Sequence, residues 1–382
     1  MPWARRTAPL PRSASRDRSP GPAHEAGCGR GGCLGLGPLT TLCGFSTGIF
    51  SARCGCVGTR HIRKEDHLKL HDTFLGPHLS SRHEFADGSL LMRNRPAGAF
   101  PSLLPGTLAR PIKDAIAAKV VALFNDRSRG EKPVGRRPDG LFGPDAVAWR
   151  VHGDVTSMMV GGVAGLLLQM LHPAVLAGVW DHSNFRADMH GRLRRTARFI
   201  ALTTYGGQAE AKAVIARVRG IHDQVCGVLP DGTPYAANDP SLLAWVHVTE
   251  TTSFLNAWVR YAEPGMSAAD QDRYFAEMAR VADALGADPI PRTRSEARHL
   301  LDAMRPLTLC NARTREVAQL VLTQRAPNMM AEPLQALTMQ AGVDLLPAWA
   351  RRMHGLHTPM FSRPLVRAGT LGVARTLRWA FE

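Results

Sequence analysis

Hydrophobic residues recur at three- and four-residue spacing along almost the whole chain from Leu104 onward, and glycine and proline separate the periodic segments. Strict alternation of hydrophobic and polar residues, which is typical of half-buried strands, is scarce. The pattern predicts an all-α fold, a single large helical bundle, with a turn or small hairpin over residues 229–235. The predicted helices span residues 107–125, 144–171, 173–180, 190–205, 208–226, 239–261, 267–286, 294–304, 312–323, 330–341, 344–356 and 364–379.

One segment is long and apolar enough to raise the question of a membrane span. Residues 155–180 contain no Asp, Glu, Lys or Arg, and a segment of this length could cross a bilayer. His172-Pro173 interrupts it, and the residue before a proline disfavours helical conformation. We therefore expect two shorter helices buried inside the bundle. Gly161 and Gly165 are four residues apart, which permits close helix packing in a membrane or in a protein core.

The C-terminal segment is basic and partly amphipathic. This pattern indicates either a docking helix with a solvated basic face or a helix that makes peripheral membrane contact. Its arginines are Arg363, Arg367, Arg375 and Arg378.

The first 91 residues differ from the rest, because they are rich in Gly, Pro, Arg and Ser and show no sustained apolar period. We expect a disordered extension or, since Met92 offers another start, a segment outside the translated protein, with the helical domain over 92–382. Five of the seven cysteines lie in this extension, but their spacing does not match the paired ligands of structural zinc. Cys226 and Cys310 are expected to be buried thiols in a reducing compartment.

The formal net charge of +15 does not by itself indicate a nucleic-acid partner. Of the 47 basic residues 41 are Arg, as GC-rich codon usage produces, and no zinc-finger, RRM or basic-zipper pattern is present. The nucleophile elbow, P-loop, dinucleotide and zincin motifs are also missing, which argues against hydrolase, NTPase, dehydrogenase and zinc-protease functions. No apolar signal segment precedes the helical body, so a cytoplasmic location is expected.

Candidate chemistry lies between residues 168 and 247, where polar side chains recur inside an apolar run. Such side chains are either satisfied internally or bound to a ligand. His222 falls on the apolar face of its predicted helix. Arg192 and Thr196 are four residues apart and therefore share a helix face, where a cation and a hydroxyl suit an anionic or oxygen-bearing ligand. The structural alternatives are a core histidine bonded to a carbonyl and a solvated basic helix.

Two further histidines lie in apolar surroundings. His247 stands in an apolar helix start, and His172 is placed to cap a helix end through its ring nitrogen. An all-helical body with an interior histidine, a cation and a hydroxyl is the kind of site that holds haem. The protein then supplies an axial nitrogen and an apolar pocket, and the haem supplies the oxygen chemistry.

Taken together, these residues resemble the catalytic domain of the oxygenase MpaB and rubber oxygenase (latex-clearing protein) family over about residues 142–309. The order and spacing of several short motifs carry the resemblance. They are Leu-Leu-Gln-Met-Leu-His172-Pro173-Ala-Val, His182-Ser183, Arg192-x3-Thr196, Val218-x3-His222-x2-Val225-x-Gly227 and Trp245-Val-His247. One departure is His190, which stands where the family pattern leads us to expect a proline nearby.

The resemblance implies an all-helical protein that binds haem b and adds dioxygen across a double bond. His222 would be the proximal iron ligand, Arg192 and Thr196 would lie on the distal side as catalytic residues, and His247 and His172 would be cofactor-binding residues. We therefore expect a haem-b-dependent oxygenase acting on a small apolar, unsaturated or lipid-like substrate. The alternatives are a non-catalytic haem-binding protein and a membrane-associated helical protein without a cofactor.

Overall fold

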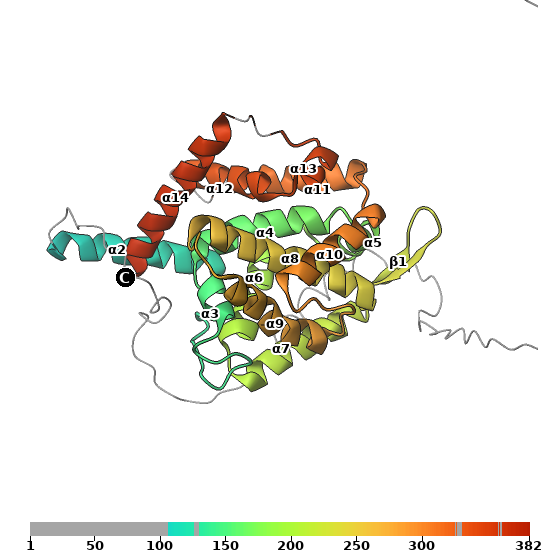
Figure 1. Ribbon diagram of the computed structural model, residues 1–382, viewed down its shortest axis with the longest axis horizontal. Helices are drawn as coiled ribbons and strands as arrows, with labels where there is room; N and C mark the ends of the chain where they lie inside the picture. Colours follow the sequence, from blue (N-terminus) through green and yellow to red (C-terminus); the bar gives the residue numbers. More distant parts are fainter. Residues whose placement is uncertain (1–105, 126–129, 325, 327–330, 358, 360) are drawn as a thin grey trace, which may run out of the picture. The chain divides into compact units, whose positions relative to one another are not determined.

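The structure, a computed structural model, describes residues 106–125, 130–324, 326, 331–357, 359 and 361–382, all within one compact unit (Figure 1). The described part is almost entirely helical, so the all-α prediction is confirmed. The expected extension over residues 1–91 and the boundary at residue 92 lie outside the described residues. The helices are α2 Gly106–Phe124, α3 Val147–His152, α4 Val155–Gln169, α5 Pro173–His182, α6 Met189–Tyr205, α7 Gln208–His222, α8 Pro240–Tyr261, α9 Ala268–Leu285, α10 Arg294–Met304, α11 Ala312–Leu322, α12 Glu332–Leu345, α13 Ala348–Met353 and α14 Ser362–Phe381.

Several predicted helices differ from the observed ones. The boundary expected between 330–341 and 344–356 lies further along, because α12 continues to Leu345 and α13 covers only Ala348–Met353. The helix expected over 144–171 is divided into α3 and α4, because Gly153 ends the first and the Asp154 side chain caps the second by accepting from Ser157 N at 2.8 Å. The helix expected over 208–226 ends at His222, since the chain enters an antiparallel hairpin of β1 Cys226–Val228 and β2 Pro234–Ala236. This hairpin confirms the turn predicted over 229–235.

The break predicted at His172-Pro173 is present. Helices α4 and α5 meet there at an angle of 103°, and together they are the one helix pair in the described residues that is long and apolar enough to pass as a broken membrane span. No single described helix meets that criterion.

Helix α4 lies in the centre of the described bundle and packs against α8 along its length (Figure 1). Two of the three glycines of α4, Gly161 and Gly165, permit this close approach. A Cβ atom on Gly161 would lie 2.8 Å from Phe254 Cδ1 and 2.9 Å from Phe254 Cα, and one on Gly165 would lie 3.5 Å from Glu250 Cα. The glycine spacing therefore serves helix packing inside the protein.

We expect Gly161→Ala to lower the free energy of unfolding by about 1–3 kcal/mol, because the added methyl group forces α4 and α8 apart. Gly162→Ala is the matched control, since a Cβ there would meet only the Phe254 ring at 3.9 Å. In a helix interior that change leaves stability equal or raises it by up to about 1 kcal/mol. Urea unfolding of both variants checks the prediction, and equal stabilities would show that α4 and α8 are not tightly packed.

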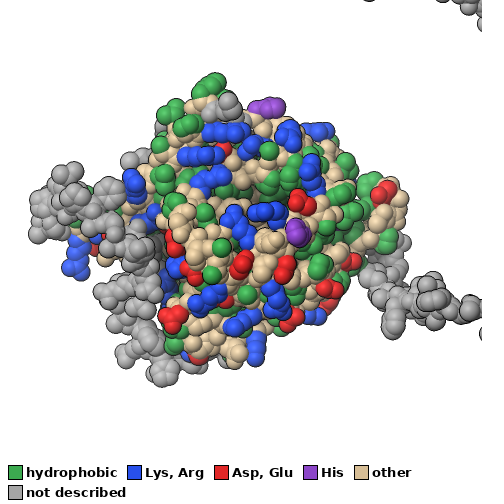
Figure 2. Space-filling model, viewed as in Figure 1, with side chains coloured by type: hydrophobic (Ala, Val, Ile, Leu, Met, Phe, Trp, Pro, Cys, Tyr) green, Lys and Arg blue, Asp and Glu red, His purple; other side chains and the backbone are tan. Residues whose placement is uncertain are grey.

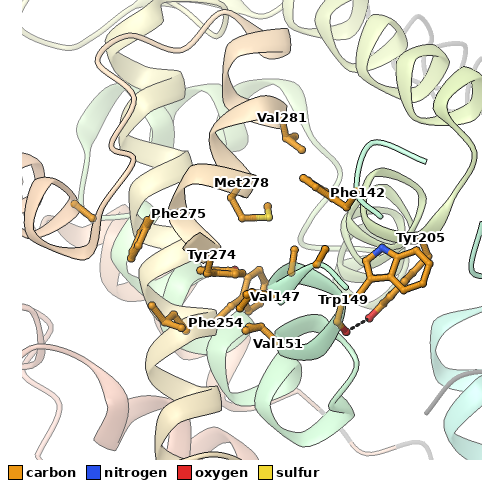
Figure 3. Packing of buried hydrophobic residues seen from close by; sticks show 14 of the residues in the cluster. Phe142, Val147, Trp149, Val151, Tyr205, Phe254, Tyr274, Phe275, Met278 and Val281 are labelled. Atoms are coloured by element: carbon orange, nitrogen blue, oxygen red, sulfur yellow. Dashed lines mark hydrogen bonds between the residues drawn. The ribbon is translucent and has the colours of Figure 1, made fainter. Parts of the chain in front are cut away.

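A cluster of large side chains joins α3 to α6, α8 and α9 (Figure 3). Trp149 Nε1 donates to the carbonyl of Thr204 at 2.6 Å, and the Tyr205 hydroxyl donates to the carbonyl of Trp149 at 3.1 Å, the bond drawn in Figure 3. Phe254 and Tyr274 bring α8 and α9 into the same cluster. These contacts hold the C-terminal end of α6 in place, and so orient the helix that carries Arg192.

The C-terminal helix α14 is a docking helix, but not all of its basic side chains are solvated. Arg378 Nε lies 2.6 Å from Asp154 Oδ2, and Arg378 Nη2 donates to the carbonyl of Tyr261 at 2.8 Å. Both side chains of this ion pair are almost fully buried. The pair anchors α14 to the start of α4, so the solvated basic face that we predicted is wrong for Arg378.

The expectation for the two cysteines of the helical body is partly wrong. Cys310 is a free thiol, although it is half-buried rather than buried. Cys226, at the start of β1, is disulfide-bonded and so is not a free thiol.

Candidate functional site

His222 is the last residue of α7, on the side of the helix that packs inward. Residues Ala211 and Ile215 of the same helix are buried, and His222 itself is half-buried. Its Nδ1 atom is buried and has no well-formed hydrogen bond among the described residues, although the Asn238 side chain lies close enough to raise the pKa of the ring. Burial lowers the pKa of the imidazole, and Asn238 and Asp223 partly offset this effect. His222 therefore presents a neutral ring with an unused nitrogen, which is what a metal ligand requires.

Arg192 lies in the first turn of α6, the partner of α7 in a helical hairpin joined by Gly206 and Gly207. Its Nη1 atom donates to Ser183 Oγ at 3.1 Å, and within the described residues it has no ion pair with a carboxylate. Burial lowers the pKa of its guanidinium to about 10, with a smaller contribution from the charge of Arg195. At neutral pH Arg192 is thus a partly desolvated cation that is available to an anionic or oxygen-bearing ligand.

Thr196 follows Arg192 by one turn on the same face of α6, as predicted. Its side chain is exposed, and its hydroxyl donates to the carbonyl of Arg192 at 3.3 Å. The structure therefore brings the two side chains together but leaves the Thr196 hydroxyl bonded to its own helix.

The end of α5 links the Arg192 side of the site to the His222 side. Ser183, which accepts from Arg192, follows His182, whose Nε2 lies 3.0 Å from the carbonyl oxygen of Cys226. Cys226 comes four residues after His222, and Val225 N donates to the carbonyl of His222 at 3.0 Å. The first turn of α6 and the last turn of α7 are therefore connected through two adjacent residues of α5.

His247 and His172 are both buried, and each has a buried ring nitrogen without a partner, Nε2 in His247 and Nδ1 in His172. Burial lowers the pKa of His247 to about 4 and also lowers that of His172. The His172 ring lies 6.1 Å from that of Trp245, two residues before His247. His172 occupies the N-cap position of α5 but makes no side-chain capping bond, so the predicted capping role is wrong.

The predicted site residues thus include three neutral, buried or half-buried imidazoles and one partly desolvated guanidinium. No hydrogen bond among the described residues joins these four side chains directly to one another. The model of the family described as "ER-bound oxygenase mpaB/B'/Rubber oxygenase, catalytic domain" matches residues 149–379.

The chain belongs to this oxygenase family.

Membership makes the protein an oxygenase-type oxidoreductase. The match contains all five predicted site residues, and it continues past residue 309 to residue 379 in the last turn of α14, so the C-terminal helices are part of the family domain. No curated protein and no solved structure matches the chain.

Within the family domain, sequence reasoning missed a buried network around His152. Its Nδ1 lies 2.8 Å from Thr204 Oγ1 and its Nε2 lies 2.8 Å from the Tyr274 hydroxyl. Burial lowers the pKa of His152 to about 3 and raises that of Tyr274 far above its usual value. The network joins α3, α6 and α9. The one feature of the sequence that could have indicated it is a histidine at the end of an apolar helix.

Glu250 was also missed, although it is a carboxyl in the apolar run of α8. Burial raises its pKa to about 7, so it is largely protonated in mildly acidic solution. It lies one turn after His247 on the same helix, where its backbone is close to Gly165 of α4. A lone acidic residue between Val248 and Phe254 was the signal that could have identified it.

The buried His152 predicts an acid-sensitive fold. Its pKa is about 3 in the folded protein and about 6.5 in an unfolded chain, so as pH falls the unfolded state binds a proton first. The contribution of neutral His152 to the free energy of unfolding is therefore present in full above pH 6.5 and is lost as pH falls toward 3. Between pH 7.5 and pH 5 the loss from this group is about 2 kcal/mol. Urea unfolding of the wild type and of His152→Gln should give a smaller pH dependence for the variant, whereas equal slopes would contradict the assignment.

Proposed function

We propose that the protein binds one haem b through His222 and oxygenates a small apolar, unsaturated or lipid-like substrate. The observation that carries the proposal is that His172, His222 and His247, three histidines of the family-like motifs, each have a buried ring nitrogen that lacks a partner. Leaving a buried polar atom unpaired costs about 1–3 kcal/mol. Other buried atoms of the described residues also lack a partner, among them His354 Nδ1 and the Tyr261 hydroxyl. The rings of His172, His222 and His247 differ from these because they belong to the motifs that resemble the family, which favours a ligand there.

The residues present fit haem better than a bare metal ion. Among the described residues no group of three or more His, Cys, Asp or Glu side chains is arranged to hold a metal. Haem iron needs only one or two ligands from the protein, because the porphyrin supplies four nitrogens. When bound, haem supplies the redox chemistry that adds dioxygen to a carbon–carbon double bond.

Each predicted residue then has a role that follows from its surroundings. The neutral imidazole of His222 holds the iron, and His247 and His172 contribute unpaired nitrogens to the cofactor pocket. Arg192, oriented by Ser183, donates hydrogen bonds to oxygen atoms that gain negative charge during the reaction. Thr196 supplies a hydroxyl on the same helix face once its bond to the α6 backbone is released.

The substrate class is supported by the composition of α6 and by the family. Leu193, Phe199 and Ile200 of α6 are half-buried and pack against hydrophobic core clusters. The description of the family includes a rubber oxygenase, which agrees with an apolar substrate.

Oxygen uptake by the haem-loaded protein tests the proposed activity. Olefinic lipids and isoprenoids are supplied under ¹⁸O₂, and we expect products that carry the label at the former double bond. A protein that binds haem but neither consumes oxygen nor labels any of these substrates would be a non-catalytic haem-binding protein, and the oxygenase proposal would fail.

A further inference from the structure

A basic pocket lies away from the site described above, between α13 and the start of α14. Its volume is about 400 Å³, and its lining includes Arg351, Arg352 and Arg363 together with His357. Gly355 separates the two helices with φ of 67°, a left-handed conformation that lets the chain reverse its direction. The reversal brings arginines of both segments to one opening.

The pocket has far more positive than negative charge around it. Residues 345–381 contain six arginines and no Asp or Glu. The nearby carboxylate is Asp344, whose side chain is fully buried and is shared by Arg367 at 2.7 Å, Arg260 at 3.1 Å and Arg363 at 3.5 Å. One carboxylate therefore neutralises only part of the cluster.

The remaining positive charge lies at the pocket itself. Arg351 donates to the carbonyls of Asp344 and Leu346, both at 3.2 Å, which satisfies hydrogen bonds but does not neutralise charge. Burial lowers the pKa of Arg351, and the charges of Arg363, Arg260 and Arg352 lower it further against the opposite effect of Asp344. Arg352 is exposed and makes no ion pair with any described residue. Such mutual repulsion is relieved when an anion binds.

Two large hydrophobic side chains stand beside the pocket in solvent. Phe361 is 84% exposed and Leu365 is 75% exposed, the highest values among the large hydrophobic residues of the described chain. They are four residues apart at the start of α14 and therefore share a helix face. Figure 2 shows Lys and Arg side chains gathered next to hydrophobic ones over the part of the surface formed by α12–α14. Cations beside exposed apolar side chains match a membrane surface, where anionic phosphates lie above the acyl chains.

We propose that this pocket binds the phosphate of an anionic membrane lipid through Arg351, Arg352 and Arg363, while Phe361 and Leu365 insert into the bilayer interface. A pocket of this size holds a headgroup phosphate with room for part of the glycerol. The site is independent of the haem proposal, since it shares no residue with it. It would bring the oxygenase domain to a lipid surface.

Vesicle co-sedimentation of the full chain tests this site. We expect binding to vesicles of phosphatidylglycerol mixed with phosphatidylcholine, at least tenfold weaker binding to pure phosphatidylcholine, and further weakening as salt rises. Arg352→Glu should weaken binding about tenfold or more, and so should Phe361→Ser combined with Leu365→Ser. Both variants change exposed side chains, and circular dichroism checks that they fold.

Arg292→Glu is the matched control, because it makes the same change of charge at an exposed position outside the pocket. It should change binding less than threefold. Equal losses for Arg352→Glu and Arg292→Glu would show attraction by net charge alone and would overturn the site. Equal binding to both vesicle types would overturn the role of the anionic headgroup. Calorimetric binding of inorganic phosphate at micromolar concentration without vesicle binding would assign the pocket to a soluble anion instead.

Discussion

His222→Ala is expected to abolish the Soret band of the protein reconstituted with haem. Haem iron without a protein ligand is held only by apolar contacts, and the other histidines belong to other helices. The proposed bond to iron depends on the unpaired Nδ1 of His222 and on the neutral state of its ring. An ultraviolet–visible titration with hemin measures the loss, and added imidazole should restore part of the band by replacing the missing ligand.

The controls for this prediction are other histidines of the same chain. His299→Ala changes an exposed side chain on α10 and should leave the spectrum unchanged. His172→Ala and His247→Ala should retain the band with weaker haem binding, because in the proposed arrangement their nitrogens contact the cofactor without holding the iron. If His222→Ala still bound one haem per chain, the ligand assignment would be wrong.

Arg192→Met is expected to lower turnover about a hundredfold or more while haem binding is retained. The substitution keeps most of the side-chain volume but removes a partly desolvated cation that has no carboxylate partner in the described structure. Removing one preorganised donor to developing negative charge typically costs a factor of 10²–10³ in rate. Oxygen uptake under saturating substrate, together with the Soret absorbance of the same sample, measures the two effects separately.

Arg198→Met is the control on the same helix. Arg198 donates to the carbonyl of Lys132 and so performs a structural task away from the face shared by Arg192 and Thr196. Its loss should leave turnover within a few-fold of the wild type. Equal reductions for the two arginines would indicate that the charge of α6, rather than the position of Arg192, supports the reaction.

Much of the fold could be predicted because it depends on local sequence. Asp239 followed by Pro240 starts α8 as expected, with the Asp239 carboxylate accepting from Ser241 N and Leu242 N. The break at His172-Pro173 follows from proline stereochemistry. The break at Gly153 and Asp154 was missed although its signal, a glycine followed by a capping aspartate, is local; the ion pair of the Asp154 carboxylate with Arg378, 224 residues further along the chain, is not local. No local pattern contains that partner.

In the candidate site, too, the features set by local sequence could be predicted and those set by contacts between distant helices could not. Helical spacing placed Arg192 and Thr196 on one face of α6 and directed His222 inward, and the structure agrees with both. The network of His152, Thr204 and Tyr274 was not predicted, because its three members come from three helices and each looks ordinary in its own segment. The exposure of Thr196 was also not predicted. Its hydroxyl donates to the backbone of its own helix, so it needs no partner in the protein interior.

The measurement that tests the central claim most directly is the ratio of haem to protein after reconstitution, determined by the pyridine haemochrome assay on the purified full chain. The account predicts one haem b per chain, held tightly enough to survive gel filtration. A chain that is folded by circular dichroism but retains no haem would contradict it, and the three unpaired histidine nitrogens would then need another ligand.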